Sequence, residues 1–429
     1  MRRIFHLALC FLLCTGFQAN ARQWTLRECI DYARTNNLQV KSAQLNQAVA
    51  EESLLAAQAA RFPSLNASSS QNMSFALDAD PRYNGSYAIQ SGVTLYNGGR
   101  IANSIRQAEI NALAGEYDID AAKNNIEIAV TQAYLNILYA KENVTTAQNN
   151  VESAKAQWER ANAMYDEGSI SLSEYAQMES QYSSDIYQLA VSESSLAQST
   201  LNLKQLLELG LEEDFAVFYP EIGDENVVAP LPSVAEVYRV AEEILPDMKS
   251  GRLGIEAAKV SEDIAAAAGI PSVSASASMS TANIYGVDLP FTDQIKENLG
   301  AGAGVTLSIP ILNNRSVKTS KAKARIGTQQ AELSYANSQK NLLSTLEGLY
   351  QDVVSAQSRF QAAQKKLQSA ELSYNLVSEK YNEGMIDPVE LLTEKNTYIA
   401  AQQELLQAKY QAILCRQLLN FYQGIPIEI

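Results

Sequence analysis

Histidine is nearly missing from this sequence of 429 residues, which holds His6 and no other. Because histidine is the commonest metal ligand and the usual general base near neutral pH, its scarcity argues against a metal site and against an enzyme. Basic residues are also few, since 33 Lys and Arg face 48 Asp and Glu, for a net charge of −15. Nucleic acid binding needs Lys and Arg against the phosphates, so no nucleic acid partner is expected. The acidity favours plain solubility, with a cation-attracting inner surface as the alternative.

Cysteine and long hydrophobic runs are equally sparse. Of four cysteines, only Cys29 and Cys415 lie outside the first 21 residues. Both fall in helical patterns, so packed thiols are the favoured interpretation, and a disulfide in an oxidising compartment is the alternative. No segment beyond the N-terminus approaches the roughly 20 apolar residues of a transmembrane helix. Any membrane crossing must therefore use β-strands.

Residues 1–21 have the pattern of a secretory signal peptide. Arg2 and Arg3 precede an apolar stretch, and Ala19-Asn-Ala21 gives a small-x-small cleavage site. Cleavage removes His6 and two positive charges, which takes the net charge from −15 to −17. N-terminal lipidation is not expected, because leucines precede Cys10 and Cys14 where a lipoprotein signal has a small residue.

The remaining chain is a duplicated unit. Tyr165-Asp-Glu-Gly-Ser-Ile170 returns 216 positions later as Tyr381-Asn-Glu-Gly-Met-Ile386. Such a repeat has to be found before a fold is named. We expect a first repeat at 22–208, a linker rich in proline and acidic residues at 209–232, and a second repeat at 233–429.

Each repeat contains an unusually long helical ladder, whose apolar or small residues alternate in steps of four and three. It runs from Ile126 to Tyr165 in the first repeat and from Leu342 to Tyr381 in the second. A 3.5-residue period predicts left-handed supercoiling, and a start near Arg100 implies a helix of about 100 Å. After Gly168 and Gly384, which suit the positive-φ position that ends a helix, a seven-residue period continues. Each repeat thus predicts a long antiparallel helical hairpin.

Short alternating segments precede the hairpins. Residues 65–75 and 87–95, and then 273–279 and 300–309, place apolar residues on one face and polar or small ones on the other. That pattern over about ten residues is typical of outer-membrane strands. A helix is expected over roughly 25–60, and 76–84 and 281–298 are expected to be outward loops. Four strands cannot close a barrel, and lipid forbids open edges, so several copies would have to share one barrel.

Together these features resemble the TolC family of trimeric outer-membrane efflux proteins. The similarity is carried by several loose motifs in a specific, duplicated order: Thr25-Leu-Arg-Glu-Cys-Ile-Asp-Tyr-Ala33, Phe62-Pro-Ser64, Ile270-Pro-Ser272, Leu95-Tyr-Asn-Gly-Gly-Arg100, Pro310-Ile-Leu-Asn-Asn-Arg315 and the paired Tyr-x-Glu-Gly segments. The resemblance implies a mostly α fold with a small β part. Three chains would make a twelve-stranded outer-membrane barrel continuous with a twelve-helix periplasmic tunnel. It also implies a passive exit duct of a tripartite efflux or type I secretion system in a Gram-negative bacterium, with no enzymatic activity and no cofactor.

Partners and site residues also follow from this resemblance. The hairpin tips would dock a periplasmic adaptor, which connects to an inner-membrane transporter of the RND, ABC or MFS type. The docking residues would be Tyr165, Glu167, Gly168, Ser169, Tyr381, Glu383, Gly384 and Met385. A periplasmic gate would involve Glu174, Glu390, Thr393 and Glu394, and Ile386 stands where a relative has a gate-locking arginine. In the plainer interpretation, Gly168 and Gly384 only end helices. Glu174 and Glu390 would then lie at helix N-termini only because the helix dipole stabilises a negative charge there.

Two other functions fit part of the pattern. A soluble periplasmic coiled-coil scaffold or adhesin shares the heptads but needs no lipid-matched strands. A secreted hydrolase with paired carboxylates lacks histidine and any nucleophile turn. Gly300-Ala-Gly-Ala-Gly304 precedes a strand and not a helix, so it is not a phosphate loop.

Overall fold

A computed structural model describes residues 23–76, 79–210, 214–220, 223 and 230–428. The predicted signal peptide at 1–21 lies outside these residues, as does much of the predicted linker. The described chain is mostly helical with a small β part, as predicted. It divides into two compact units: a hairpin unit (residues up to 41, 122–241 and from 343 onward) and a sheet unit (42–121 and 242–342).

The duplication is visible in the element bounds. Helix α4 spans Arg100–Asp166 and α9 spans Ser316–Asn382, and each has 67 residues. Helix α5 (Leu172–Leu206) and α10 (Pro388–Tyr422) each have 35 residues. Every one of these bounds recurs 216 positions later, which is the offset found in the sequence. None of the helices in the described residues is both long and apolar enough to cross a membrane.

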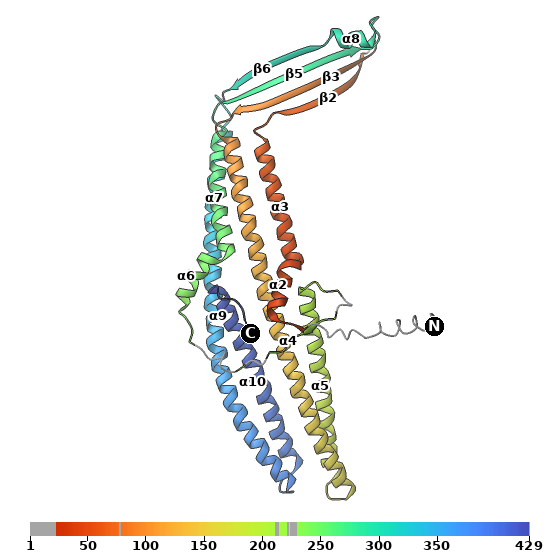
Figure 1. Cartoon of the computed structure of the whole chain (residues 1–429), viewed down its shortest axis with the longest axis vertical. Coiled ribbons are helices and arrows are strands. Elements are labelled where there is room, and N and C mark those ends of the chain that lie inside the picture. Colours follow the sequence, from red (N-terminus) through yellow and green to blue (C-terminus); the bar gives the residue numbers. More distant parts are fainter. Residues whose placement is uncertain (1–22, 77–78, 211–213, 221–222, 224–229, 429) are drawn as a thin grey trace, which may run out of the picture. The chain divides into compact units, whose positions relative to one another are not determined.

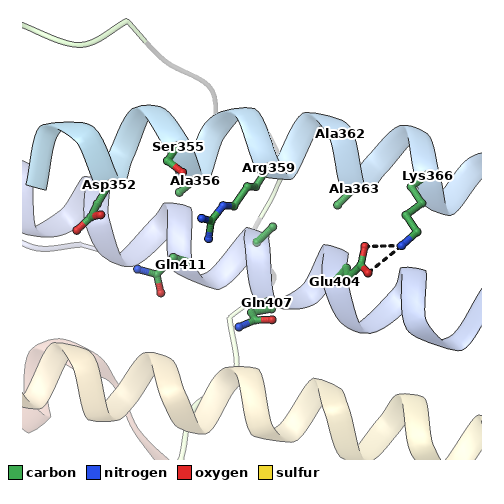
Figure 2. A pocket seen from close by; sticks show the side chains of 11 residues that line it. Asp352, Ser355, Ala356, Arg359, Ala362, Ala363, Lys366, Glu404, Gln407 and Gln411 are labelled. Carbon is green, nitrogen blue, oxygen red and sulfur yellow. Dashed lines mark hydrogen bonds and ion pairs between the residues drawn. The ribbon is translucent and has the colours of Figure 1, made fainter.

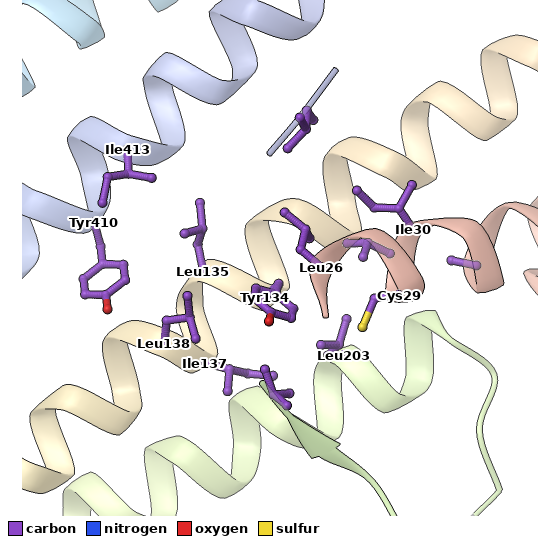
Figure 3. Packing of buried hydrophobic residues seen from close by; sticks show 14 of the residues in the cluster. Leu26, Cys29, Ile30, Tyr134, Leu135, Ile137, Leu138, Leu203, Tyr410 and Ile413 are labelled. Carbon is purple, nitrogen blue, oxygen red and sulfur yellow. The ribbon is translucent and has the colours of Figure 1, made fainter. Parts of the chain in front are cut away.

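In the hairpin unit the apolar positions of the heptad pattern are buried. Val130, Ile137 and Val144 on α4 are almost inaccessible to solvent, as are Leu346 and Val353 on α9. Helix α2 (Leu26–Asn36) adds to this core: Figure 3 shows Cys29 and Ile30 of α2 beside Tyr134 of α4 and Leu203 of α5. The Tyr134 hydroxyl donates a hydrogen bond of 2.6 Å to the Phe218 carbonyl. This contact fixes a short parallel pair, β1 (Gln23–Trp24) with β4 (Ala216–Val217), which the sequence pattern did not predict.

The first predicted helix is two helices, a correction to the single one expected over 25–60. Helix α2 ends at Asn36 and α3 runs over Leu38–Ala59. Between them Asn37 is extended, with ψ at 138°. Its amide donates to the Leu206 carbonyl at 3.0 Å, and its side-chain oxygen accepts from the Gln39 N–H at 2.8 Å. An asparagine side chain that replaces backbone partners in this way stops one helix and starts the next.

The sheet unit contains one antiparallel sheet in the order β2-β3-β5-β6 (Figure 1). Its strands are β2 (Ser64–Ala76), β3 (Ala79–Tyr96), β5 (Ser272–Ile284) and β6 (Gly300–Ser308). The predicted loop at 76–84 is therefore wrong for 79–84, which belong to β3. The predicted loop at 281–298 is likewise wrong at both ends, because β5 continues to Ile284 and Phe291–Glu297 form helix α8. The remaining elements are α6 (Val234–Ile244) and α7 (Pro246–Ala267).

Register gives the sheet two unlike faces. Met279 lies opposite Ile89 on one side and Ala301 on the other, and Ala275 lies opposite Val305. Because paired residues project to the same side and residues alternate along a strand, these positions share one face, here called the outer face. Ser276, Ser278, Gln90, Gly302 and Gly304 share the opposite, polar face, here called the inner face.

Candidate functional site: the two hairpin tips

The first tip is a helix stop built on Gly168. Helix α4 ends at Asp166, and Gly168 follows with φ at 72°, a conformation that glycine adopts without strain. The Ser169 N–H donates back to the Met164 carbonyl at 2.8 Å and the Gly168 N–H to the Tyr165 carbonyl at 2.9 Å. These two bonds satisfy carbonyls that the helix end leaves open. Tyr165, Glu167, Gly168 and Ser169 are all exposed there.

The second tip repeats this geometry at Gly384, whose φ is 74°. The Met385 N–H donates to the Lys380 carbonyl at 2.9 Å and the Gly384 N–H to the Tyr381 carbonyl at 3.0 Å. Met385 is 73% exposed, whereas Tyr381 is buried. Around Gly168 and Gly384 an added Cβ atom would meet nothing within 4 Å. Both tips are thus hydrogen-bonded turns with open space around their glycines.

Aromatic stacking holds the two arms of each hairpin together above its turn. Trp158 of α4 stacks on Tyr182 of α5 with ring centroids 5.5 Å apart, and Tyr165 stacks on Tyr175 at 5.4 Å. In the second hairpin Tyr374 of α9 stacks on Tyr398 of α10, also at 5.4 Å. Trp158 and Tyr374 therefore pack the two arms of their hairpins together. Such pairs add about 0.5–1.5 kcal/mol each beyond the area that they bury.

A small apolar cluster joins the two hairpins near their tips. Its buried members come from all four helices: Ala161, Met178, Val377, Tyr381 and Leu391, with Ile170 and Ile386 packed against them. Two polar contacts accompany the cluster. The Arg160 guanidinium donates to the side-chain oxygen of Asn382 at 2.5 Å and to its carbonyl at 2.7 Å. The Gln157 amide donates to the Tyr374 hydroxyl at 3.0 Å.

The four predicted gate residues lie in different surroundings. Glu174 forms a capping box with Ser171: the Ser171 N–H donates to Glu174 Oε2 at 2.6 Å, and the Glu174 N–H donates to the serine oxygen at 3.2 Å. Burial raises the pKa of Tyr381, the Arg160 charge lowers it and the Glu174 charge raises it. The Glu174 carboxylate therefore acts both as a helix cap and on the second hairpin.

On the second hairpin, Glu390 is exposed and its N–H is capped by the Asp387 carboxylate at 3.1 Å. The Thr393 hydroxyl donates to the Val389 carbonyl of its own helix at 2.7 Å. Glu394 reaches α9, where its carboxylate accepts a hydrogen bond from the Ser373 hydroxyl at 2.9 Å. Glu394 thus contacts the neighbouring helix α9. Glu390 is bonded to Asp387 at the N-terminus of α10, and Thr393 is bonded to Val389 within α10.

One ion pair between the hairpins was missed by the sequence analysis. Lys395 Nζ lies 3.1 Å from Asp185 Oδ2, with side chains only 2% and 9% exposed. The Gln181 amide donates to the other Asp185 oxygen at 2.8 Å. Its position in the sequence was the one indication of this pair. Lys395 lies four residues after Leu391 and three before Tyr398, so a charged residue occupies a core position of the heptad pattern. Charged rungs in a heptad specify register.

A groove of about 460 Å³ lies beside this region, between α9 and α10 (Figure 2). Lys366 crosses it to Glu404, with Nζ 2.8 Å from both carboxylate oxygens. Its other lining residues are small, polar or charged: Asp352, Ser355, Ala356, Arg359, Ala362, Ala363, Gln407, Ala408 and Gln411. Among the described residues no cluster of three or more His, Cys, Asp or Glu side chains is arranged to hold a metal ion.

Cys29 and Cys415 are free and buried, so the favoured interpretation as packed thiols is confirmed. Burial, together with the nearby Glu28 carboxylate, raises the pKa of the Cys29 thiol to about 12. Burial also raises the pKa of Cys415. Both thiols are therefore protonated and unreactive at neutral pH.

Comparison with known proteins agrees with this geometry. The structure is similar to that of CusC, with a TM-score of 0.80 and 21% identity over 96% of this chain and 95% of that one. It is also similar to VceC from Vibrio cholerae (TM-score 0.75, 18% identity, 94% and 97% covered) and to CmeC from Campylobacter jejuni (0.73, 19%, 94% and 87%).

No curated protein sequence matches the chain. A family described as "Outer membrane efflux protein" matches residues 29–208 and 237–422, which include both tips and all four sheet strands. The resemblance to TolC-like proteins is confirmed, and the family places the protein in the Gram-negative outer membrane with a periplasmic extension. The chain belongs to the outer membrane efflux protein family.

Proposed function

We propose that three copies of this chain form one channel, the passive exit duct of a tripartite efflux or type I secretion system. The observation that carries the proposal is the four-stranded sheet, which has two open edges and one exposed apolar face. Within the described residues, a single copy leaves the outer edges of β2 and β6 unpaired and the apolar part of the outer face exposed. Family membership supports an efflux role in the outer membrane.

The outer face has the character of a lipid-facing surface. Leu65, Ile89, Met279, Val305 and Leu307 are 74%, 49%, 47%, 70% and 59% exposed. The apolar stretch from Val273 to Met279 spans about 20 Å at 3.4 Å per residue, close to the roughly 25 Å apolar band of outer-membrane barrels. Serine, glycine and glutamine on the inner face suit a water-filled interior.

The open edges set the number of copies. Strands β2 and β6 each pair on one side within this chain, and unpaired backbone groups cost several kcal/mol each in lipid. If β2 of one copy pairs with β6 of the next, three four-stranded sheets give twelve strands in one closed barrel. The helices α4, α5, α9 and α10 of three copies would likewise make a twelve-helix tunnel, with neighbouring helices covering the groove between α9 and α10.

The hairpin tips are the proposed docking site for a periplasmic adaptor, through which an RND, ABC or MFS transporter would deliver substrate. Exposed Glu167, Ser169, Glu383 and Met385 beside two fixed turns supply a surface of defined shape. Glu174, Glu390, Thr393 and Glu394 are the proposed periplasmic gate. The repeats 22–208 and 233–429, joined by 209–232, would both contribute to this one barrel and tunnel.

Gate closure in this chain would depend on apolar contact more than on an arginine salt bridge. Ile386 packs against the Tyr381 and Leu391 cluster, and the Arg160 bonds to Asn382 tie the first hairpin to the end of α9. Untwisting of the inner hairpin helices at the tips would separate these contacts, as a two-state element biased by adaptor binding.

Planar-bilayer recording tests the proposal. The purified protein should give stepwise conductance that prefers cations, and Glu390→Gln should lower that preference because it removes one carboxylate per copy from the gate. Thr397→Ala, farther along the same helix, serves as the control. Glu390→Gln traces identical to wild type would remove Glu390 from the gate. A protein that stays in detergent-free buffer and conducts nothing would favour the periplasmic scaffold instead.

A further inference from the structure

The connection between β5 and β6 is an ordered segment anchored to the sheet. Gln294 of α8 is 8% exposed. Its Oε1 accepts from the Ile284 N–H at 2.7 Å, and its Nε2 donates to the carbonyls of Ile284 at 3.1 Å and Leu289 at 2.8 Å. The Asn298 amide donates to the Ala282 carbonyl at 2.8 Å. Helix α8 is therefore tied to the end of β5 from its middle, through Gln294, and from its C-cap, through Asn298; Figure 1 shows α8 beside that end of the sheet.

Side-chain contacts show which face of the sheet α8 covers. The Thr281 hydroxyl donates to the Ile295 carbonyl at 2.7 Å, and the Phe291 ring meets the Tyr87 ring edge-on with centroids 6.4 Å apart. Thr281 lies opposite Tyr87 in the register, two residues beyond the Met279–Ile89 pair. Residues two apart on a strand project to the same side. Helix α8 thus lies on the outer face, the same face that carries the apolar band.

Beneath α8 the outer face changes from apolar to polar. The Gln71 amide donates to the Tyr87 hydroxyl at 2.8 Å, and that hydroxyl donates to the Asn283 side-chain oxygen at 3.5 Å. Asn283 is only 1% exposed. Buried polar groups at a lipid boundary are costly unless they are paired and covered, and α8 supplies that cover.

The outward side of the segment mixes apolar and charged residues. Val287, Leu289 and Phe291 are 55%, 37% and 49% exposed. Asp288, Asp293, Lys296 and Glu297 lie among them. Tyr83 and Tyr285 add an edge-on aromatic pair at 6.4 Å beside the segment. Apolar and aromatic groups interleaved with charges are typical of elements at a membrane–water interface, since neither lipid core nor bulk water suits both.

We propose that residues 285–299 form an interfacial collar, which lies on the outer face at the membrane rim. In it Val287, Leu289 and Phe291 enter the boundary between headgroups and acyl chains of the outer leaflet. The inference rests on the proposed membrane-spanning role of the sheet, because it continues that sheet's lipid-facing surface. In this arrangement the segment contacts lipid on the outer face and does not reach the inner face, so the collar does not close the channel mouth.

Spin labels on the full-length protein in liposomes test this assignment. Single labels are placed by Phe291→Cys in the collar, Val305→Cys on the outer face and Ser278→Cys on the inner face; Cys29 and Cys415 are buried and stay unlabelled. Collision with O₂, which concentrates in lipid, is compared with collision with the water-soluble complex NiEDDA. Val287→Cys, at a more exposed position, is a second collar label in case the Phe291 variant does not assemble.

The collar predicts that O₂ collisions exceed NiEDDA collisions at 291 and 287, with a smaller excess than at 305, and that the order reverses at 278. Labels at 291 and 287 that meet mainly NiEDDA, while 305 reports lipid, would overturn the collar and leave the proposed channel standing. Collar labels shielded from both reagents would point to a second copy and also overturn it. A label at 305 that reports water would overturn the channel together with the collar.

Discussion

At the scale of single residues, the core of the hairpin unit determines the chemistry of both thiols. Cys29 is fully buried against Tyr134 and Leu203, and its pKa of about 12 leaves almost no thiolate at pH 8.

We therefore expect a maleimide to label neither Cys29 nor Cys415 in the folded protein at pH 8, and to label both once the chain is denatured without reductant. Mass spectrometry counts the adducts. Rapid labelling of the folded protein would contradict the packing described for Cys29. A denatured chain that takes up no label would instead reveal a disulfide.

The buried pair of Lys395 and Asp185 is the second residue-scale feature. Removing one partner strands a buried charge, which costs about 3–5 kcal/mol, whereas replacing both by apolar residues of similar volume is often neutral. Lys395→Ala should lower the guanidinium midpoint markedly, and Lys395→Met with Asp185→Leu should restore most of it.

The exposed pair Lys366–Glu404, half open to solvent on both sides, gives a matched control. Lys366→Ala should shift the midpoint little, since exposed pairs contribute about 0–1 kcal/mol. Equal midpoints for Lys395→Ala and Lys366→Ala would show that the buried pair is not a structural tie between the hairpins.

At the scale of elements, both tips depend on glycine for a backbone conformation and not for space, because a Cβ at Gly384 would meet nothing. A β-branched residue at φ 74° is strained by about 1–2 kcal/mol, and asparagine tolerates the same region. Gly384→Val should therefore abolish export, read as loss of efflux-dependent resistance in cells, while the amount of protein in the outer-membrane fraction stays unchanged.

Gly384→Asn keeps the left-handed turn and should retain most export. If Gly384→Val exports as well as wild type, the turn is not required for docking. If Asn is as defective as Val, the side chain itself, and not the backbone turn, disturbs the partner surface.

Long elements were predictable from sequence, and short ones were not. The ladders of α4 and α9 repeat over many turns, so Arg100 as the helix start and Gly168 and Gly384 as turns follow from local pattern. Strand β1 has two residues and depends on the Tyr134 hydroxyl from far along the chain. The break at Asn37 depends on the Leu206 carbonyl. Helix α8 depends on Gln294 bonding across to β5. The first two contacts join residues far apart in the chain and the third spans ten residues, and none of them leaves a periodic pattern in the sequence.

At the tips, too, the local features were predictable from sequence and the contacts between distant residues were not. The Glu-Gly motifs predict the two turns. The Arg160–Asn382 contact and the Lys395–Asp185 pair could not be predicted in this way, because they join residues more than 200 positions apart. Only the position of Lys395 on an apolar rung hinted at a buried partner.

At the scale of the whole molecule, the two faces of the sheet give opposite predictions for neighbouring residues. Val305 lies on the outer face and Thr306 on the inner face. An arginine on the lipid face costs about 2–4 kcal/mol near the bilayer midplane, and a lumen position tolerates it. Val305→Arg should reduce the amount of assembled protein in outer-membrane fractions, and Thr306→Arg should assemble normally with lower cation preference. Equal assembly of the two variants would mean that the faces are not divided between lipid and water.

The central claim is that one copy cannot seal its own sheet and that three copies do so together. The most direct measurement is the mass of the purified protein in detergent by native mass spectrometry, with bound detergent removed in the gas phase. If three copies share one barrel, the spectrum should show a complex of three chains that separates only on heating. A single chain that remains folded and dissolved without detergent would contradict it.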